Sequence, residues 1–210
     1  MELKFLGGNC IKITSKKASI VIDDLVNTQN KSVATDKDVV IRTVQSDEQP
    51  KHYFFIDGPG EYEVSEVSVR GIAARAHVDD ENAGKNSTIY RILIDDVKIG
   101  VLGHIYPDLS DDQLEDLGTI DVLFVPVGGN GFTLDGVGAA KLIRKIEPKI
   151  VVPTNYDDEK TKYEVPATDL PTALKALGME ASETVESIKI KGTDVSMMGD
   201  TARLVVIEPK

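Results

Sequence analysis

The sequence has no tryptophan, one cysteine and three histidines, and aromatic residues make up 5% of its 210 positions. A single thiol, Cys10, cannot form an intrachain disulfide, so the composition suits a reducing compartment. Cys10 lies between Asn9 and Ile11 in an apolar-rich stretch. This setting favours a buried, unreactive thiol over a nucleophile.

Long apolar runs are also missing. No stretch approaches the roughly 18 residues of a membrane-spanning helix, and the first residues carry no apolar signal-peptide core. We therefore expect a cytoplasmic protein. Basic residues are few, 24 against 35 acidic ones, which gives a formal net charge of −11. This charge repels phosphate backbones and anionic lipids, so we expect neither nucleic acid nor a membrane as a partner.

The first half of the chain is predicted to form short strands separated by turns. Apolar residues either alternate with polar ones, as in half-buried strands, or form the dense runs of deeply buried strands. The expected strands cover 3–5, 11–13, 18–23, 39–41, 52–56 and 63–69. Segments 87–94 and 97–102, joined by Asp95-Asp96, predict a β-hairpin. The Gly58-Pro59-Gly60 turn is expected to form another hairpin corner.

Helices are predicted only in the second half. Ser110 and Gln113 form a capping-box pattern, and Asp135 is a suitable N-cap for a helix that stops at Glu147-Pro148. A third helix is predicted over 170–177. Strands are expected at 121–125, 150–153, 188–190 and 204–207. This order of elements predicts an α/β protein with two packed sheets and outer helices, in one domain spanning 1–210.

Three motifs resemble a known family when they are taken in order. They are Ile56-Asp57-Gly58-Pro59-Gly60-Glu61-Tyr62-Glu63-Val64, Arg70-Gly71-Ile72, and Gly84-Lys85-Asn86-Ser87-Thr88-Ile89-Tyr90. The chain resembles the bacterial Zn-dependent hydrolases of the metallo-β-lactamase fold, in the branch near the ascorbate-6-phosphate lactonases. The resemblance implies a four-layer αββα sandwich. It also implies one or two Zn²⁺ ions that activate water in members with a complete ligand set.

The family's His-x-His-x-Asp-His motif, which follows a buried strand, is absent here. Aligned on the strand at 39–41, its four positions become Val44, Ser46, Glu48 and Gln49. Valine cannot bind a metal, and serine and glutamine are poor zinc ligands beside imidazole. With the same alignment, two other histidine positions are also altered. The degenerate ligand positions are Gly8, Val44, Ser46, Gln49 and Asn155.

Two histidines remain at expected ligand positions. His77 stands where the family has a histidine, and His104 replaces the bridging aspartate. With Glu48 they are the candidate remnant of a metal site, and Asp79 or Asp80 are alternative third ligands. A mononuclear site needs about three protein ligands and an open position. Zinc is therefore a candidate cofactor here, although the simpler expectation is that the protein has none.

Two functions remain open at this point. The favoured hypothesis is a pseudoenzyme: a non-catalytic binding or assembly module, whose partner is an unknown small molecule or protein and which could form a homo-oligomer. The alternative is a metal-dependent hydrolase of a small ester, lactone or phosphoester with a rearranged site. Whether the chain is an enzyme is therefore uncertain, since a fold by itself does not imply a function.

Overall fold

The computed structural model describes residues 1–25, 31–45, 54–78, 87–163 and 165–210. Its strands form two sheets, one of six strands in the order β13-β1-β2-β3-β4-β5 and one of eight in the order β12-β14-β11-β10-β9-β8-β7-β6. The first contains β1 (Glu2–Phe5), β2 (Ile11–Thr14), β3 (Ser19–Ile22), β4 (Val39–Ile41), β5 (Phe54–Ile56) and β13 (Ile188–Lys189). The second contains β6 (Gly60–Val64), β7 (Val67–Ala74), β8 (Ser87–Ile94), β9 (Val97–Val101), β10 (Val122–Pro126), β11 (Ile150–Thr154), β12 (Ala181–Val185) and β14 (Arg203–Ile207).

The two sheets share one hydrophobic core. Leu3 and Phe5 of β1 are fully buried while their neighbours Glu2 and Lys4 are half-exposed, so the predicted alternation is confirmed. Tyr90 of β8 is among the largest fully buried side chains. Burial of this apolar surface is the main force that holds the sheets together. The prediction of an α/β protein with two packed sheets is therefore confirmed.

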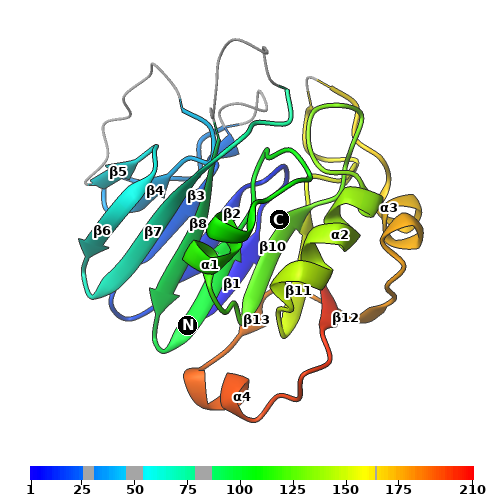
Figure 1. Ribbon diagram of the computed structural model, residues 1–210. Coiled ribbons are helices and arrows are strands. Elements are labelled where there is room, and N and C mark those ends of the chain that lie inside the picture. Colours follow the sequence, from blue (N-terminus) through cyan, green and yellow to red (C-terminus); the bar gives the residue numbers. More distant parts are fainter. Residues whose placement is uncertain (26–30, 46–53, 79–86, 164) are drawn as a thin grey trace.

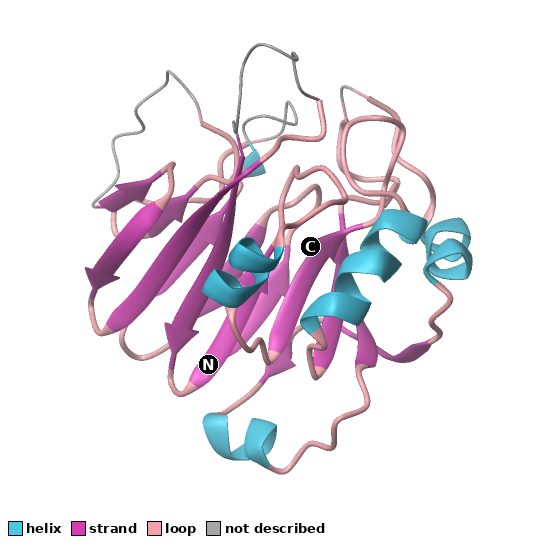
Figure 2. Ribbon diagram, in the orientation of Figure 1, coloured by secondary structure: helices cyan, strands magenta, loops and turns pink. Residues whose placement is uncertain are grey.

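Helices α1 (Asp111–Leu117) and α2 (Gly136–Ile146) lie over the eight-stranded sheet, as Figure 1 shows, and α3 (Leu170–Leu177) packs beside α2. Each predicted cap is present: the Ser110 capping box, the Asp135 N-cap, and Gly178 after α3. Figure 2 shows the same helices in cyan, with α4 (Gly192–Ser196) at the lower end of the molecule. Among the described residues, no helix combines the length and apolar character needed to span a bilayer.

Two turn predictions have different outcomes. The hairpin β8–β9 is confirmed, and Asp95 and Asp96 both adopt positive φ in its turn. The predicted strand 63–69 is wrong, because Ser65 and Glu66 form a second tight turn there and divide it into β6 and β7. The segment Gly58-Pro59-Gly60 is not a hairpin corner. It carries the chain from β5 in one sheet to β6 in the other.

Two elements were not predicted. Strand β12 has mainly polar, exposed residues at the edge of its sheet, and α4 has only five residues, so neither shows an apolar periodicity. The prediction for Cys10 is confirmed in its burial: the thiol is fully buried, and burial raises its pKa. The thiol form is therefore favoured, which is the unreactive one.

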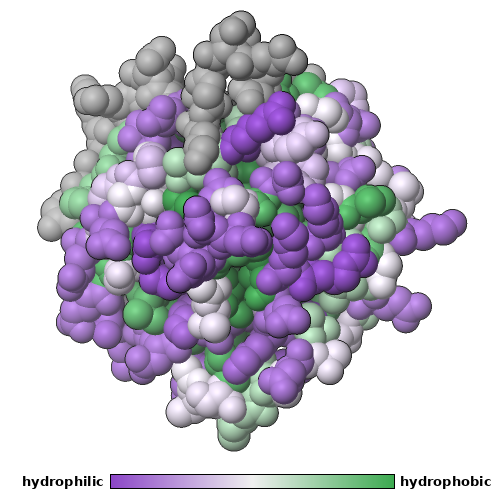
Figure 3. All heavy atoms as spheres, in the orientation of Figure 1, coloured by the Kyte–Doolittle hydropathy of each residue, from purple (hydrophilic) through white to green (hydrophobic). Residues whose placement is uncertain are grey.

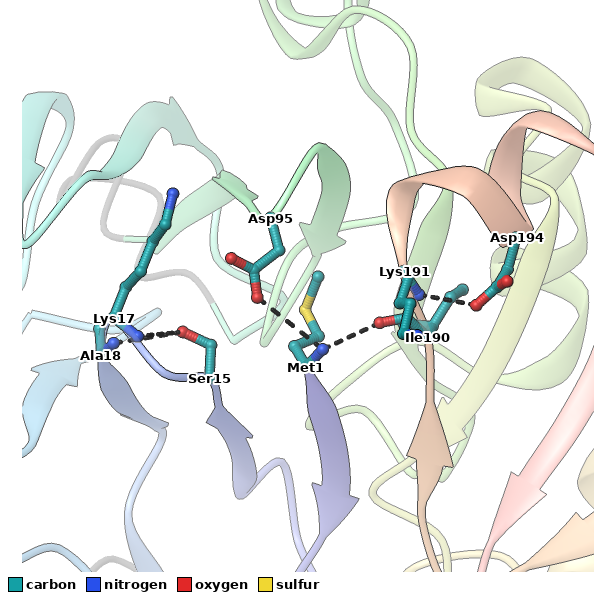
Figure 4. A network of polar contacts seen from close by, with 8 residues as sticks. All are labelled: Met1, Ser15, Lys17, Ala18, Asp95, Ile190, Lys191 and Asp194. Atoms are coloured by element: carbon teal, nitrogen blue, oxygen red, sulfur yellow. Dashed lines mark hydrogen bonds and ion pairs between the residues drawn. The ribbon is translucent and has the colours of Figure 1, made fainter.

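Polar contacts close the lower end of the sandwich (Figure 4). The ammonium nitrogen of Met1 donates a hydrogen bond of 2.9 Å to the carbonyl of Ile190 and lies 3.8 Å from the Asp95 carboxylate. Nearby, the Lys191 backbone N–H donates to Asp194 at the start of α4. These contacts join β1 to the β8–β9 turn and to the chain after β13. The carboxyl end of β1 therefore lies at the opposite end of the sandwich.

Candidate functional site

Strands from both sheets end together at the upper edge of the molecule in Figure 1. β3 and β4 are parallel in one sheet, and β9, β10 and β11 are parallel in the other. The segments that follow these strands surround a cavity of about 210 Å³. Loops at the carboxyl ends of strands are where α/β proteins usually place their ligands. This cavity is therefore the candidate functional site.

A chain of hydrogen bonds forms the floor of the cavity. The Thr154 hydroxyl donates to Oδ1 of Asn9 at 2.8 Å, and Nδ2 of Asn9 lies 3.2 Å from Nε2 of His104. The Thr43 hydroxyl donates to Asp23 at 2.6 Å and lies 3.5 Å from Nδ1 of His104. Four of these five residues follow strand ends, and Thr154 is the last residue of β11.

When Asp23 is ionised, the directions of these bonds indicate which ring nitrogen of His104 carries the hydrogen. A hydroxyl has one hydrogen, and Thr43 gives it to the Asp23 carboxylate, so Thr43 can only accept from His104. Nδ1 of His104 then carries a hydrogen. The Asn9 amide nitrogen lies 3.2 Å from Nε2 and 3.4 Å from Nδ1. In a neutral ring with its hydrogen on Nδ1, the lone pair on Nε2 is the acceptor for this amide. Burial lowers the pKa of His104, with Asp23 opposing this effect, and the neutral form is favoured.

Asp23 is the acidic end of this chain, and its pKa lies above the ordinary value because burial is the largest influence on it. Its carboxylate accepts from both the backbone N–H and the hydroxyl of Thr43, at 2.7 and 2.6 Å. Burial raises the pKa of Asp23, while His104 and the Thr43 hydrogen bonds act in the opposite direction. Thr43 is itself held in place, because its carbonyl accepts from the Ser87 hydroxyl and the Thr88 N–H.

Gly103 allows the two strand ends at the cavity floor to lie close together. Its φ is +60°, in the region that favours glycine, and a Cβ there would overlap the side chain of Thr43. The ends of β4 and β9 can therefore approach closely, which brings His104 next to Thr43. A larger residue would push these two strand ends apart.

The other polar residues of the lining differ in how many hydrogen bonds they make within the protein. Asp24 accepts hydrogen bonds from Leu25, Ser32 and Val33. The Tyr163 hydroxyl donates to the Tyr156 carbonyl at 2.7 Å and accepts from the Gly8 N–H at 3.1 Å. The Asn155 side chain is different. It is 4% exposed, and its amide makes no hydrogen bond with any described residue.

The walls and mouth of the cavity are apolar. The described residues that provide this surface are Val44, Ala76, Val78, Phe132 and Val165. The ring of Phe132 meets the His104 ring edge-on, with centroids 5.1 Å apart. Ligand pockets commonly combine such apolar walls with a few polar groups.

The structure brings some of the sequence-predicted residues together. His104, Val44 and Asn155 line the cavity, and Gly8 lies beside it, since its carbonyl accepts from the Asn155 N–H at 2.7 Å. Residues Ser46, Glu48 and Gln49 lie outside the described residues, as do Asp79 and Asp80.

The side chain of His77 lies elsewhere than that of His104. Its N–H donates to the His104 carbonyl at 2.8 Å, but its ring packs beside Tyr106, with centroids 5.9 Å apart. The ring is not among the described groups that line the cavity, and its buried Nδ1 has no partner among them. The expectation that both histidine rings face the cleft is therefore met by His104 alone. The three-residue site of His77, His104 and Glu48 stays a prediction.

The described donors do not fit the zinc site that the fold family implies. In the described ranges, no group of three His, Cys, Asp or Glu residues is placed to hold a metal ion. Both ring nitrogens of His104 already contact Asn9 and Thr43. Val44 offers no donor atom, and Asn155 offers only a neutral amide, which is a poor zinc ligand.

Sequence reasoning missed several residues of the site. Asn9, Asp23 and Thr43 form the floor, yet none was predicted as a site residue, although Asn9 directly follows the altered ligand position Gly8. The one available signal is position, because Asp23 and Thr43 directly follow dense apolar strands. Phe132 and Tyr163 come from loops after β10 and β11, where no pattern marks them in advance.

The comparisons with solved structures show the fold. A Thermotoga maritima protein assigned to the Zn-dependent hydrolases of the metallo-β-lactamase superfamily is 23% identical, covers 99% of this chain and 98% of its own, and has a TM-score of 0.71. A Parabacteroides distasonis protein assigned as a metal-dependent hydrolase is 16% identical, with 99% and 93% coverage and a TM-score of 0.63. The diiron β-hydroxylase CmlA from Streptomyces venezuelae is 11% identical, with 98% and 53% coverage and a TM-score of 0.63.

These identities are low enough to support the fold alone, and the fold predicted from the motifs, of the metallo-β-lactamase type, is confirmed. No curated protein is similar in sequence to the chain. Residues 2–155 match the model of the family described as the β-lactamase superfamily domain. The match covers more than half of the 210 residues, so the chain belongs to that family.

Proposed function

We propose that this protein is a non-catalytic member of its family, a pseudoenzyme that binds a small molecule in the cavity at the strand ends. The observation that carries the proposal is the state of His104. It is the one imidazole among the described lining residues, and its two ring nitrogens contact Asn9 and Thr43, so a metal would have to displace one of these contacts.

The neighbouring positions support the same conclusion. Val44 and Asn155 stand where the motif alignment expects histidines, and both line the cavity with His104. Catalytic zinc sites use about three charged or imidazole ligands and leave one position for water. A valine and a neutral amide cannot supply them. Without a metal, the water-activating step of the family's hydrolysis has no catalyst here.

The cavity nevertheless keeps the character of a binding site. Val44, Val78, Phe132 and Val165 are exposed at its mouth, and they are four of the eight large apolar side chains exposed in the described parts of the chain. Single exposed apolar residues are common, but their concentration around one opening is typical of a ligand site.

Four further properties remain part of the proposal. The protein is cytoplasmic, and it binds neither nucleic acid nor a membrane surface, in line with its net charge of −11. Its function could involve a protein partner or self-association into a homo-oligomer instead of a small molecule alone. Size-exclusion chromatography with light scattering tests self-association directly.

A second candidate is a metal-dependent hydrolase of a small ester, lactone or phosphoester. One observation favours it: Nδ1 of His77 is buried and has no hydrogen-bond partner among the described residues. A buried imidazole nitrogen without a partner is a usable metal ligand. Glu48, which the hypothesis needs as a third ligand, lies outside the described residues.

Elemental analysis separates the two candidates. Purified, untagged protein is measured before and after incubation with excess Zn²⁺ and desalting. We expect well below one zinc per chain in both samples, and no hydrolysis of a panel of lactones and phosphoesters. A ratio near one or two that falls in His77→Ala or His104→Ala, together with hydrolysis lost in the same variants, would establish the hydrolase.

A fragment screen tests the binding role. Ligand-observed NMR on the wild type identifies fragments that bind, and each is then measured with Val44→Trp, which narrows the cavity mouth. The matched control is Val137→Trp, because Val137 is an exposed valine on α2 that does not line the cavity. We expect fragments that bind wild type and Val137→Trp but not Val44→Trp. Their absence would contradict the proposal.

A further inference from the structure

We propose that the cavity binds a small organic cation, a primary ammonium group on an apolar body. The inference rests on the proposed binding function and names the class of its ligand. Its basis is the combination of two acidic side chains, an amide that has no hydrogen-bond partner among the described residues, and apolar walls in one cavity.

The charge of the lining selects against anions. The charged or basic residues among the described lining are Asp23, Asp24 and His104, and neither lysine nor arginine is among them. A phosphate or carboxylate would therefore meet these acidic side chains without a lysine or arginine in the described lining to balance its charge, and desolvating it there would be costly.

Asp23 has acceptor capacity left for a ligand. Each of its oxygens accepts one hydrogen bond from Thr43, and a carboxylate oxygen has two lone-pair sites. Asp24 has fewer acceptor sites left, because Oδ1 accepts two hydrogen bonds and Oδ2 accepts one. An ammonium group brings three donors and a positive charge, which suits the free sites on Asp23 and offsets the cost of its burial.

Asn155 supplies the second recognition group. Its side chain is 4% exposed, lines the cavity, and makes no hydrogen bond with a described residue. Its backbone φ is +53°, a conformation that asparagine tolerates better than most residues other than glycine. Because it has no partner among the described residues and lines the cavity, the amide is free to bind a ligand group there. Its oxygen can accept from the same ammonium group or from a neighbouring donor.

The amide alone does not choose between ligand charges, since it can both donate and accept. The acidic side chains beside it favour a positively charged ligand over a negatively charged one. Phe132 and the valines at the mouth provide apolar contact for the ligand body.

The volume of the cavity limits the size of the ligand's apolar part. A protein cavity of about 150 Å³ holds benzene. The present cavity measures about 210 Å³, which leaves room for a ring of that size with a short aminoalkyl arm. 2-Phenylethylamine is therefore a suitable probe. 2-Phenylethanol and phenylacetate are its neutral and anionic counterparts of nearly the same shape.

The three probes are titrated into the full-length protein at pH 7.5 by isothermal calorimetry and by protein NMR. We expect the amine to bind about tenfold more tightly than the alcohol, because a charged hydrogen bond is stronger than a neutral one, and phenylacetate to bind most weakly. Val44→Trp should abolish amine binding.

Two variants test the recognition groups. Asp23→Asn should weaken amine binding about tenfold and alcohol binding much less, because it removes the charge. The Asn oxygen can still accept from the Thr43 N–H, and the new NH2 can donate to the Thr43 hydroxyl in place of the bond that Asp23 accepted. Asp108→Asn is the matched control, since this exposed carboxylate lies outside the cavity lining. Asn155→Gly removes the amide and tolerates the positive φ, so it should weaken binding of both the amine and the alcohol without loss of folding.

Each result bears on one of the two claims. Equal or tighter binding of 2-phenylethanol or phenylacetate, lost in Val44→Trp, would overturn the cationic ligand class and leave the binding function standing. Binding of none of the three probes would also overturn the ligand class, while the zinc measurement and the fragment screen would still decide the proposed function. Amine binding that is unchanged in both Asp23→Asn and Asn155→Gly would overturn the assignment of these residues.

Discussion

The Asn9 amide links two sheets through His104. Its nitrogen lies 3.2 Å from Nε2 of His104, which follows β9, while Asn9 itself follows β1 in the other sheet. On its other side, its oxygen accepts from Thr154 at the end of β11. One buried side chain therefore fixes how the strand ends meet at the cavity floor.

We predict that Asn9→Leu lowers the free energy of unfolding by about 1–3 kcal/mol, because it leaves the buried Thr154 hydroxyl without its partner. Urea denaturation followed by circular dichroism measures the change. In a Thr154→Val background the same substitution should cost less, since the partner is already gone. Equal costs in the two backgrounds would show that the contact contributes nothing.

The second prediction concerns the close approach of β4 and β9. Gly103→Ala should destabilise the protein by about 2–4 kcal/mol, because it combines a positive φ with a steric clash against Thr43. Gly131→Ala is the matched control: Gly131 also has a positive φ, but its added Cβ would meet no atom within 4 Å. It should cost only about 1 kcal/mol. Equal unfolding midpoints for the two variants would exclude the clash.

The third prediction is a pH dependence from His104. Burial lowers its pKa below the ordinary 6.5, so below pH 6.5 the unfolded chain binds a proton that the folded protein does not. Stability from this group is therefore present above pH 6.5 and is lost as the pH falls toward the folded pKa. NMR titration of the imidazole should show a midpoint below 6.5.

Asp23 provides the control for this titration. Its charge raises the pKa of His104 against the effect of burial, so Asp23→Asn should lower the His104 midpoint further. His77 acts in the same direction as burial. A His104 midpoint at or above 6.5 in the wild type would contradict the neutral ring that the hydrogen-bond chain requires.

The fourth prediction concerns Tyr163. Its hydroxyl donates to the Tyr156 carbonyl and accepts from the Gly8 N–H, so it holds two loops together at the cavity rim. Tyr163→Phe should cost about 1–2 kcal/mol of unfolding free energy. Tyr106→Phe serves for comparison, because the Tyr106 ring is 38% exposed and its hydroxyl forms no hydrogen bond with a described residue. A similar loss in both variants would argue against the specific role of Tyr163.

Local features were predictable because their causes lie within a few residues. The Ser110 capping box, the Asp135 N-cap and the Asp95-Asp96 turn each depend on groups within three or four positions. The same reasoning failed at Ser65-Glu66, where no glycine, proline or asparagine marks the turn and the apolar alternation continues across it. It also missed β12, whose polar residues gain their place from pairing with β14.

The sequence by itself determined which ligand types are available at the cavity: it has valine at 44, glycine at 8 and asparagine at 155 whatever the fold. Only the tertiary structure decided what those residues and His104 contact. Asn9 meets His104 across 95 positions and Thr154 across 145, and Thr43 meets His104 across 61. A hydrogen bond acts over about 3 Å, so such contacts exist only after both sheets have packed and their strand ends have converged.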